Sequence, residues 1–89
     1  MTRLVLDIIN EKGLHARASA RLVECVEKFD AEAVISKDGL DVAGDSIMGL
    51  LMLAASQGTS IEVETSGTEA DALAKALSVL VADRFGEEK

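Results

Sequence analysis

In the segment Ile61-Glu62-Val63-Glu64-Thr65, apolar or uncharged residues alternate with glutamates. Successive side chains of a β-strand point to opposite faces, so this pattern predicts a strand with one buried and one solvated face. Such a strand is typical of an antiparallel sheet that is covered on a single side. Glu62 and Glu64 fall on the solvated face, where they favour solubility rather than acid–base chemistry.

Three further segments predict strands of the same sheet. Leucine, valine and isoleucine dominate residues 3–9, and the sequence Asn10-Glu11-Lys12-Gly13 breaks that strand. Residues 33–37 and 40–43 flank Asp38-Gly39, a pair that is typical of a tight turn. These last two segments are therefore predicted to form a hairpin.

Three segments show the helical spacing of apolar residues. The first spans residues 16–28, and the last spans residues 69–85, with Thr68 as its candidate N-cap. Between them, Ser46 is a good N-cap for a short helix that begins at Ile47. A glycine at position 58 is placed to end that short helix.

The apolar sides of these helices supply much of the expected core. In the first helix they are Ala18, Leu22, Cys25, Val26 and Phe29. In the short helix they are Ile47, Leu50, Leu51 and Ala54. In the last helix they are Leu73, Leu77, Leu80 and Val81. The solvated face of the first helix carries Arg17, Arg21, Glu24 and Lys28. Cys25 is therefore predicted to be a packed small residue rather than a nucleophile or a ligand.

The order strand, helix, strand, strand, helix, strand, helix predicts the fold class. Short strands with amphipathic helices on one face give an α+β two-layer sandwich. No linker, low-complexity segment or strong repeat divides the 89 residues, so residues 1–89 are predicted to be one domain. The charged tail, residues 86–89, is predicted to be frayed.

The composition argues against several classes of function. A net charge of −7 with scattered basic residues argues against nucleic acid, whose phosphates require clustered Lys and Arg. The longest apolar stretch, residues 47–55, is too short to cross a bilayer. One cysteine and no export signal indicate a reducing cytoplasm. A single His and a single Cys lack further convergent ligands, so no metal is expected. A domain of this size also has no room for a large cofactor in its own cavity, so no cofactor is expected.

The single histidine lies in Gly13-Leu14-His15-Ala16-Arg17, where a glycine-containing loop meets the first turn of a helix. The first N–H groups of a helix have no internal partners, and the helix dipole adds positive potential. The backbone of Ala16, Arg17 and Ala18 could therefore stabilise a phosphoryl group, and the Arg17 guanidinium matches its oxygens. The same field disfavours the imidazolium, so His15 is expected to favour the neutral, nucleophilic form. His15 and Arg17 are the candidate catalytic pair of a reversible phosphoryl carrier.

By itself, a lone histidine before a helix is often a capping or surface residue, and the residues alone leave that interpretation open. A second motif, Ser46-Ile47-Met48-Gly49-Leu50-Leu51, follows about thirty residues later. Together the two motifs resemble HPr, the histidine-containing phosphocarrier family of the phosphoenolpyruvate-dependent phosphotransferase system, over nearly the whole chain. The resemblance implies an open-faced β-sandwich. In that fold three helices cover one face of a four-stranded antiparallel sheet of strand order 1-4-2-3.

The resemblance also implies a function. His15 would accept a phosphoryl group on Nδ1 from enzyme I, which is itself charged from phosphoenolpyruvate. The phosphoryl group would then pass to an enzyme IIA domain. Such a protein is a carrier rather than an enzyme, and it is expected to act as a cytoplasmic monomer without a cofactor.

The chain resembles most the nitrogen-branch form of the family, NPr, whose relay regulates metabolism. This narrower resemblance lies in residues 29–32, 50–54 and 61–64. Sugar-branch HPr is the alternative. One departure from the family pattern is Ala18, where these proteins usually have a proline. Proline fixes φ and lacks an N–H, so Ala18 makes the turn looser and adds one donor that could face an anion. The carrier function is expected to survive, with rates and partner preference affected.

Ser46 has a regulatory interpretation beside its capping role. In some HPr proteins the matching serine is phosphorylated by an ATP-dependent HPr kinase/phosphorylase. A phosphate at Ser46 would lie beside Asp45 and repel an acidic partner site. A regulatory module switched by Ser46, no longer carrying phosphate on His15, is therefore a second hypothesis, and the presence of both His15 and Arg17 argues against it. A third hypothesis is a plain ligand-binding α+β domain, but the small, aromatic-poor composition does not indicate the pocket that such a domain needs.

By resemblance, the surface of the first two helices docks both partners. The residues expected there are Arg17, Arg21, Ile47, Met48, Leu51 and Met52. Flexible methionine side chains suit a surface that must fit more than one partner, although packing in the core is the alternative for them. The two arginines would give this surface a positive rim that attracts acidic partners.

Overall fold

The computed structural model describes residues 1–89 and contains the predicted order of elements. The elements are β1 (Thr2–Asp7), α1 (Ala16–Glu27), β2 (Glu32–Lys37), β3 (Leu40–Ala43), α2 (Ile47–Met52), β4 (Ser60–Ser66), α3 (Ala70–Ala82) and a final 3-10 turn, η1 (Arg84–Gly86). No helix combines the length and the apolar character needed to cross a membrane.

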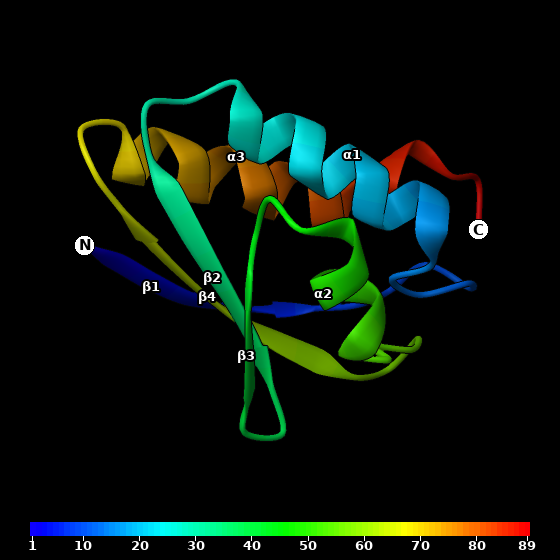
Figure 1. Cartoon of the computed structure of the whole chain (residues 1–89). Helices are drawn as coiled ribbons and strands as arrows, with labels where there is room; N and C mark the ends of the chain where they lie inside the picture. Colours follow the sequence, from blue (N-terminus) through cyan, green and yellow to red (C-terminus); the bar gives the residue numbers. More distant parts are fainter.

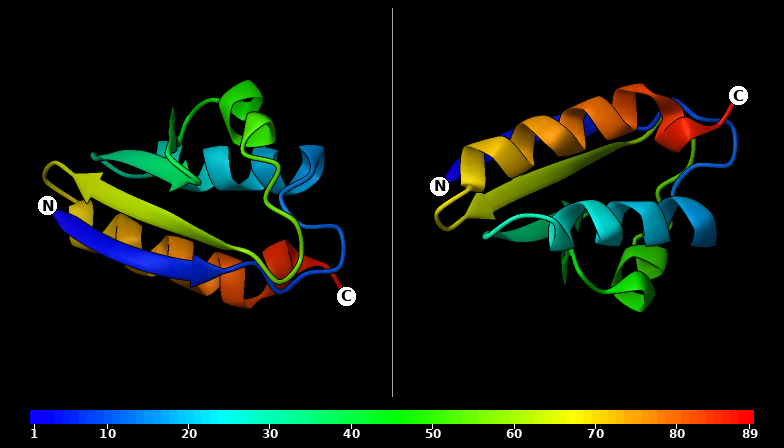
Figure 2. Two further views of the ribbon diagram at one scale, coloured as in Figure 1. Left: turned by 90° about the horizontal axis from the view of Figure 1, so that it is seen from below. Right: turned by 90° about the horizontal axis from the view of Figure 1, so that it is seen from above.

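The four strands form one antiparallel sheet in the order β1-β4-β2-β3. The predicted fold class and strand order are therefore confirmed. All three helices lie on one face of the sheet, with α3 over β1 and β4 and next to α1 (Figures 1 and 2). The short helix α2 packs against α1 and β3. Both the start of α1 and the C-terminus lie at the same end of the molecule (Figure 1).

The central strand β4 shows the burial pattern that its sequence predicts. Ile61, Val63 and Thr65 are buried, whereas Glu62 is exposed on the open face. The buried Thr65 hydroxyl donates to the backbone oxygen of Ala70 at 2.8 Å, so this polar group is not left without a partner. Each fully buried aliphatic side chain stabilises the fold by about 1.5–3 kcal/mol. The helix side of β4 is therefore a main component of the core.

The prediction for the short helix is wrong in length and in its buried side. α2 ends at Met52, not near Gly58, because Ala54 adopts a left-handed conformation (φ 51°) that reverses the chain. The chain after the helix then turns inward. Leu50 is fully buried in the core, but Ile47 and Leu51 are 40% and 37% exposed and Ala54 is exposed. A helix of six residues presents only one narrow row to its neighbours, so its other apolar side chains face solvent.

The predictions for both ends of the chain also need correction. The first strand ends at Asp7 rather than at residue 9, although Ile8 still exchanges backbone hydrogen bonds with Gly58 and Thr59. The last helix begins at Ala70 with Glu69 at its N-cap position, so Thr68 does not cap it, and it ends at Ala82.

The tail is ordered rather than frayed. Phe85 is completely buried in the core although it follows the helix in a left-handed conformation (φ 54°). The backbone N–H of Glu11 donates to the oxygen of Lys89 at 3.0 Å, which ties the last residue to the loop after β1. The apolar Phe85 side chain is the physical reason, because its burial pulls the charged residues that follow against the body of the protein.

Cys25 lies half-buried against the core, as predicted for a packed residue. Burial raises the pKa of its thiol above the ordinary value, and the nearby Lys28 ammonium opposes this only in part. A thiol with a raised pKa forms little thiolate, which is the reactive species. The structure therefore supports a packing role for Cys25.

Gly13 is the position where the loop before α1 depends most on the absence of a side chain. It has a φ of +64°, and a Cβ there would lie 2.5 Å from the backbone oxygen of Ala55. We expect Gly13→Ala to lower the free energy of unfolding by roughly 1–3 kcal/mol, measured by urea denaturation. Gly58→Ala is the matched control, since Gly58 also has a positive φ (+89°) but has open space around its Cα. Equal losses in the two variants would show that the close approach at Gly13 is unimportant.

Ser46 caps α2 as predicted, because its Oγ accepts a hydrogen bond from the Gly49 N–H at 3.1 Å. We expect Ser46→Ala to lower the free energy of unfolding by about 1 kcal/mol, since the N–H loses its partner. Ser46→Asp retains an acceptor and should stay close to the wild type. Ser56→Ala serves as the control, because the Ser56 side chain is exposed and makes no hydrogen bond. A Ser46→Ala protein as stable as this control would contradict the capping role.

Candidate functional site

His15 occupies the N-cap position of α1. Its backbone is extended (φ −79°, ψ −174°), and its carbonyl accepts the helical hydrogen bond from the Ser19 N–H at 2.8 Å. No side chain caps this first turn. The N–H groups of Ala16, Arg17 and Ala18 lie at the first three helical positions, where an α-helix offers them no acceptor. The helix therefore presents free donors and the positive end of its dipole beside the histidine.

The loop that leads to His15 is held from several sides. The Leu14 N–H donates to the Ala55 oxygen at 2.8 Å, and the Ser19 hydroxyl donates to the Leu14 oxygen at 3.3 Å. The side-chain amide of Asn10, which is fully buried, donates to the Gly13 oxygen at 2.8 Å. Because these contacts fix the residues on both sides of His15, its Cα has little freedom to move.

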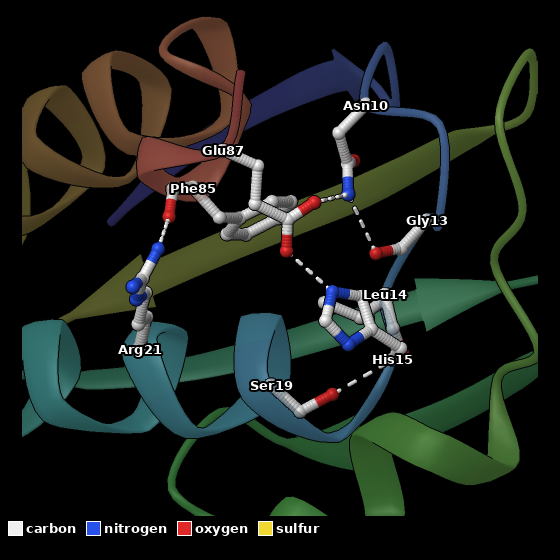
Figure 3. A network of polar contacts seen from close by, with 8 residues as sticks. All are labelled: Asn10, Gly13, Leu14, His15, Ser19, Arg21, Phe85 and Glu87. Atoms are coloured by element: carbon white, nitrogen blue, oxygen red, sulfur yellow. Dashed lines mark hydrogen bonds and ion pairs between the residues drawn. The ribbon is translucent and has the colours of Figure 1, made fainter. Parts of the chain in front are cut away.

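The side chain of His15 meets the C-terminal tail. Its Nε2 contacts the Oε2 of Glu87, while the Oε1 of Glu87 accepts a hydrogen bond from Asn10 Nδ2 at 3.0 Å (Figure 3). The two side chains are only partly accessible, at 28% for His15 and 15% for Glu87. The second ring nitrogen, Nδ1, points away from Glu87 (Figure 3). One nitrogen of the ring is therefore engaged and the other is available.

The carboxylate of Glu87 is ionised at neutral pH. Its pKa lies below the ordinary glutamate value because of the hydrogen bond from Asn10, opposed by burial and assisted by the contact with His15 and by the charge of Lys12. A carboxyl group with a lowered folded-state pKa stabilises the fold above its unfolded pKa. That contribution disappears as the pH falls through the folded value. The ring of His15 thus experiences a negative charge that the sequence reasoning did not include, in addition to the positive end of α1.

Arg17 is exposed and its guanidinium makes no hydrogen bond or ion pair. It borders a surface hollow of about 340 Å³ beside the site. All the residues that line the hollow are charged: Glu11, Lys12, Arg17, Glu87, Glu88 and Lys89. The free donors of Arg17 can therefore reach an anion in this hollow without first breaking another contact.

The other predicted site residues lie on α1 and α2, which pack together. Arg21 is half-buried, and its guanidinium donates to the backbone oxygen of Phe85 (Figure 3). Met48 and Met52 are 72% and 67% exposed, so the alternative that they fill the core is wrong. With Ile47 and Leu51 they form an exposed apolar surface on α2, which we call the α2 surface. No three His, Cys, Asp or Glu side chains gather closely enough to hold a metal ion.

Sequence reasoning missed two residues of the site, Asn10 and Glu87. Asn10 has the ordinary appearance of a loop residue, and Glu87 lies in a run of charges at the chain end. The one available signal was Phe85-Gly86, an apolar residue followed by a glycine, which is typical of a chain that turns back after a helix. It could not indicate which residue the tail would reach.

Comparison with known proteins assigns the family. The family model PTS-HPr, described as "PTS HPr component phosphorylation site", matches residues 3–83. The chain is 44% identical to the phosphocarrier protein HPr of Neisseria meningitidis over 87 residues, which cover 98% of each chain. It is 34% identical to the phosphocarrier protein NPr of Escherichia coli K12 over 84 residues, which cover 93% of each.

A solved structure is similar over the full length. The crystal structure of HPr-C-His from Thermoanaerobacter tengcongensis matches with a TM-score of 0.95 and 36% sequence identity, covering 100% of both chains. The matched residues include the loop of His15, α1 and the whole sheet. The chain therefore belongs to the HPr family of phosphocarrier proteins, which act between enzyme I and enzyme IIA in the phosphotransferase system and are carriers rather than enzymes.

Proposed function

We propose that this chain carries a phosphoryl group on Nδ1 of His15, taking it from enzyme I and passing it to an enzyme IIA domain. The observation that carries the proposal is the position of the ring at the uncapped start of α1, with Nε2 engaged by Glu87 and Nδ1 free (Figure 3). A nucleophile needs an accessible lone pair, and its product needs a site for negative charge. Both requirements meet at this helix end.

In the proposed transfer, the Nδ1 lone pair forms a bond to phosphorus as the bond from phosphorus to the donor atom of enzyme I breaks. The electron pair of that bond returns to the donor. The phosphoryl oxygens then lie near the first N–H groups of α1 and the guanidinium of Arg17, which has no competing partner. Donors that are in place before the charge arrives cost no reorganisation during the transfer. Transfer to enzyme IIA repeats these steps in reverse.

The α2 surface is the proposed docking site for both partners, together with the exposed side of α1. Ile47, Met48, Leu51 and Met52 are accessible on α2 and lie next to the helix that begins at His15. Four exposed apolar side chains on one short helix of a chain with a net charge of −7 are a feature that a partner can cover. Arg17 adds a positive charge beside it. We expect the carrier to work as a cytoplasmic monomer.

Regulation at Ser46 is a secondary proposal. Ser46 lies at the start of the α2 surface, directly after Asp45. A phosphate added there by an HPr kinase/phosphorylase would place a second negative charge beside Asp45, where an acidic partner approaches. The modification would reduce docking without altering His15 itself.

The carrier function is tested by the intact mass of the protein after incubation with phosphoenolpyruvate and catalytic enzyme I. The wild type should gain the mass of one phosphoryl group, and the adduct should be labile in acid and stable in alkali. His15→Ala should gain nothing, because His15 is the only histidine in the chain. Lys75→Ala, a change at an exposed position of α3 away from the α2 surface, is the control that retains both the acceptor and the docking site. A wild type that remains unmodified by enzyme I of either branch would overturn the proposal.

The narrower proposal is the nitrogen branch, based on the segments 29–32, 50–54 and 61–64. Relatives named HPr and relatives named NPr both match the chain. The branch is therefore tested by measuring how fast each of the two types of enzyme I phosphorylates His15. We expect nitrogen-type enzyme I to phosphorylate His15 at least tenfold faster, at equal concentration, than sugar-type enzyme I, a difference of about 1.4 kcal/mol in activation free energy. Faster transfer from the sugar-type enzyme would assign the chain to the sugar branch instead.

A further inference from the structure

We propose that Glu87 is a positioning residue for phosphoryl transfer, in that it holds His15 with the proton on Nε2 and the lone pair on Nδ1. The inference rests on the proposed function of His15 and identifies the group that prepares the ring for it. Its basis is the contact between the Glu87 carboxylate and Nε2, which joins residues at opposite ends of the chain (Figure 3).

A neutral imidazole carries one proton, on either nitrogen, and the partner of the ring decides which. An ionised carboxylate is only an acceptor, so it selects the tautomer whose proton lies on the nearer nitrogen, Nε2. Nδ1 then keeps its lone pair and faces away from the negative charge of Glu87 (Figure 3). The contact therefore both selects the reactive tautomer and sets the orientation of the ring.

Glu87 is itself fixed in place, as a positioning residue must be. Its second oxygen accepts a hydrogen bond from the buried Asn10, whose amide nitrogen also donates to Gly13. Two acceptors around one amide nitrogen set the orientation of the Asn10 side chain. The backbone N–H of Glu87 donates to the backbone oxygen of Arg84 at 2.9 Å, and the burial of Phe85 secures the adjacent turn.

The same contact assists the transfer step. When Nδ1 forms its bond to phosphorus, the ring becomes more positive and the Nε2–H becomes a stronger donor. The proton stays on Nε2, and the Glu87 carboxylate accepts a stronger hydrogen bond in the transition state than in the ground state. An interaction that strengthens in this way raises the transfer rate.

A Glu87→Gln variant makes a specific prediction because of Asn10. The bond to the Gly13 oxygen holds the orientation of the Asn10 amide, so its second N–H still faces residue 87 and takes the single carbonyl oxygen of the new glutamine. The glutamine NH₂ group then faces Nε2, which must become the acceptor, and the proton moves to Nδ1. That tautomer has no lone pair on Nδ1. Glu87→Ala removes the contact but does not impose the wrong tautomer.

The first test is nitrogen NMR of protein labelled with ¹⁵N-histidine, at a pH at which the ring is neutral. His15 is the only histidine, so a single ring contributes to the spectrum. The wild type should show a protonated Nε2 and an unprotonated Nδ1, and Glu87→Gln should exchange the two. Glu88→Gln is the matched control, since Glu88 lines the same hollow but does not touch His15, and it should resemble the wild type. Identical ring spectra in all these proteins would overturn the proposal. This result does not depend on whether His15 carries a phosphoryl group.

The second test is the rate of phosphorylation by enzyme I. We expect Glu87→Ala to be about tenfold slower than the wild type, the loss typical of a hydrogen bond to a charged group. Glu87→Gln should be slower still, on the order of a hundredfold, because the wrong tautomer predominates. Glu88→Gln should match the wild type. If Glu87→Gln transfers as fast as Glu88→Gln while His15 of the wild type is phosphorylated normally, the role of Glu87 fails and the carrier function stands.

Discussion

The close approach of the loop before His15 to the backbone of residues 55–56 is the constraint on which the site depends. Gly13 lies so near these residues that no side chain fits between them, and the Leu14 N–H bonds directly to the Ala55 oxygen. This contact joins segments about forty residues apart in the sequence. It determines where α1 begins and therefore where the free donors of its first turn lie relative to the histidine.

The C-terminal turn provides the second support of the site, at an energetic cost. Arg84 and Phe85 both adopt left-handed backbone conformations, each of which costs about 1–3 kcal/mol for a residue other than glycine. Burial of the Phe85 side chain and the bond from Arg21 to its carbonyl offset this cost. The strained turn directs Glu87 toward the ring of His15, so local strain is stored where the chemistry needs an oriented group.

In the proposed function, phosphoryl transfer and partner docking use different parts of the molecule. The ring of His15 is surrounded by fixed backbone and by the Asn10–Glu87 pair, which favours one reproducible geometry. The α2 surface, by contrast, exposes flexible side chains such as Met48 on a six-residue helix that buries only Leu50 completely. A rigid acceptor beside an adaptable surface suits a carrier that presents one atom to more than one partner.

Local sequence patterns were sufficient to predict the fold class, the Ser46 cap and the location of His15 at the start of a helix. The strand order came from the family resemblance. These features follow from periodicity, capping preference and two short motifs, all of which act over a few residues. The tertiary structure alone decided that α2 stops at Met52, that Ile47 and Leu51 face solvent, and that the tail packs against the loop. It also brought Asn10 and Glu87 to the histidine. The physical reason is that these outcomes depend on the burial of Phe85 and on contacts between distant segments, for which no local pattern carries information.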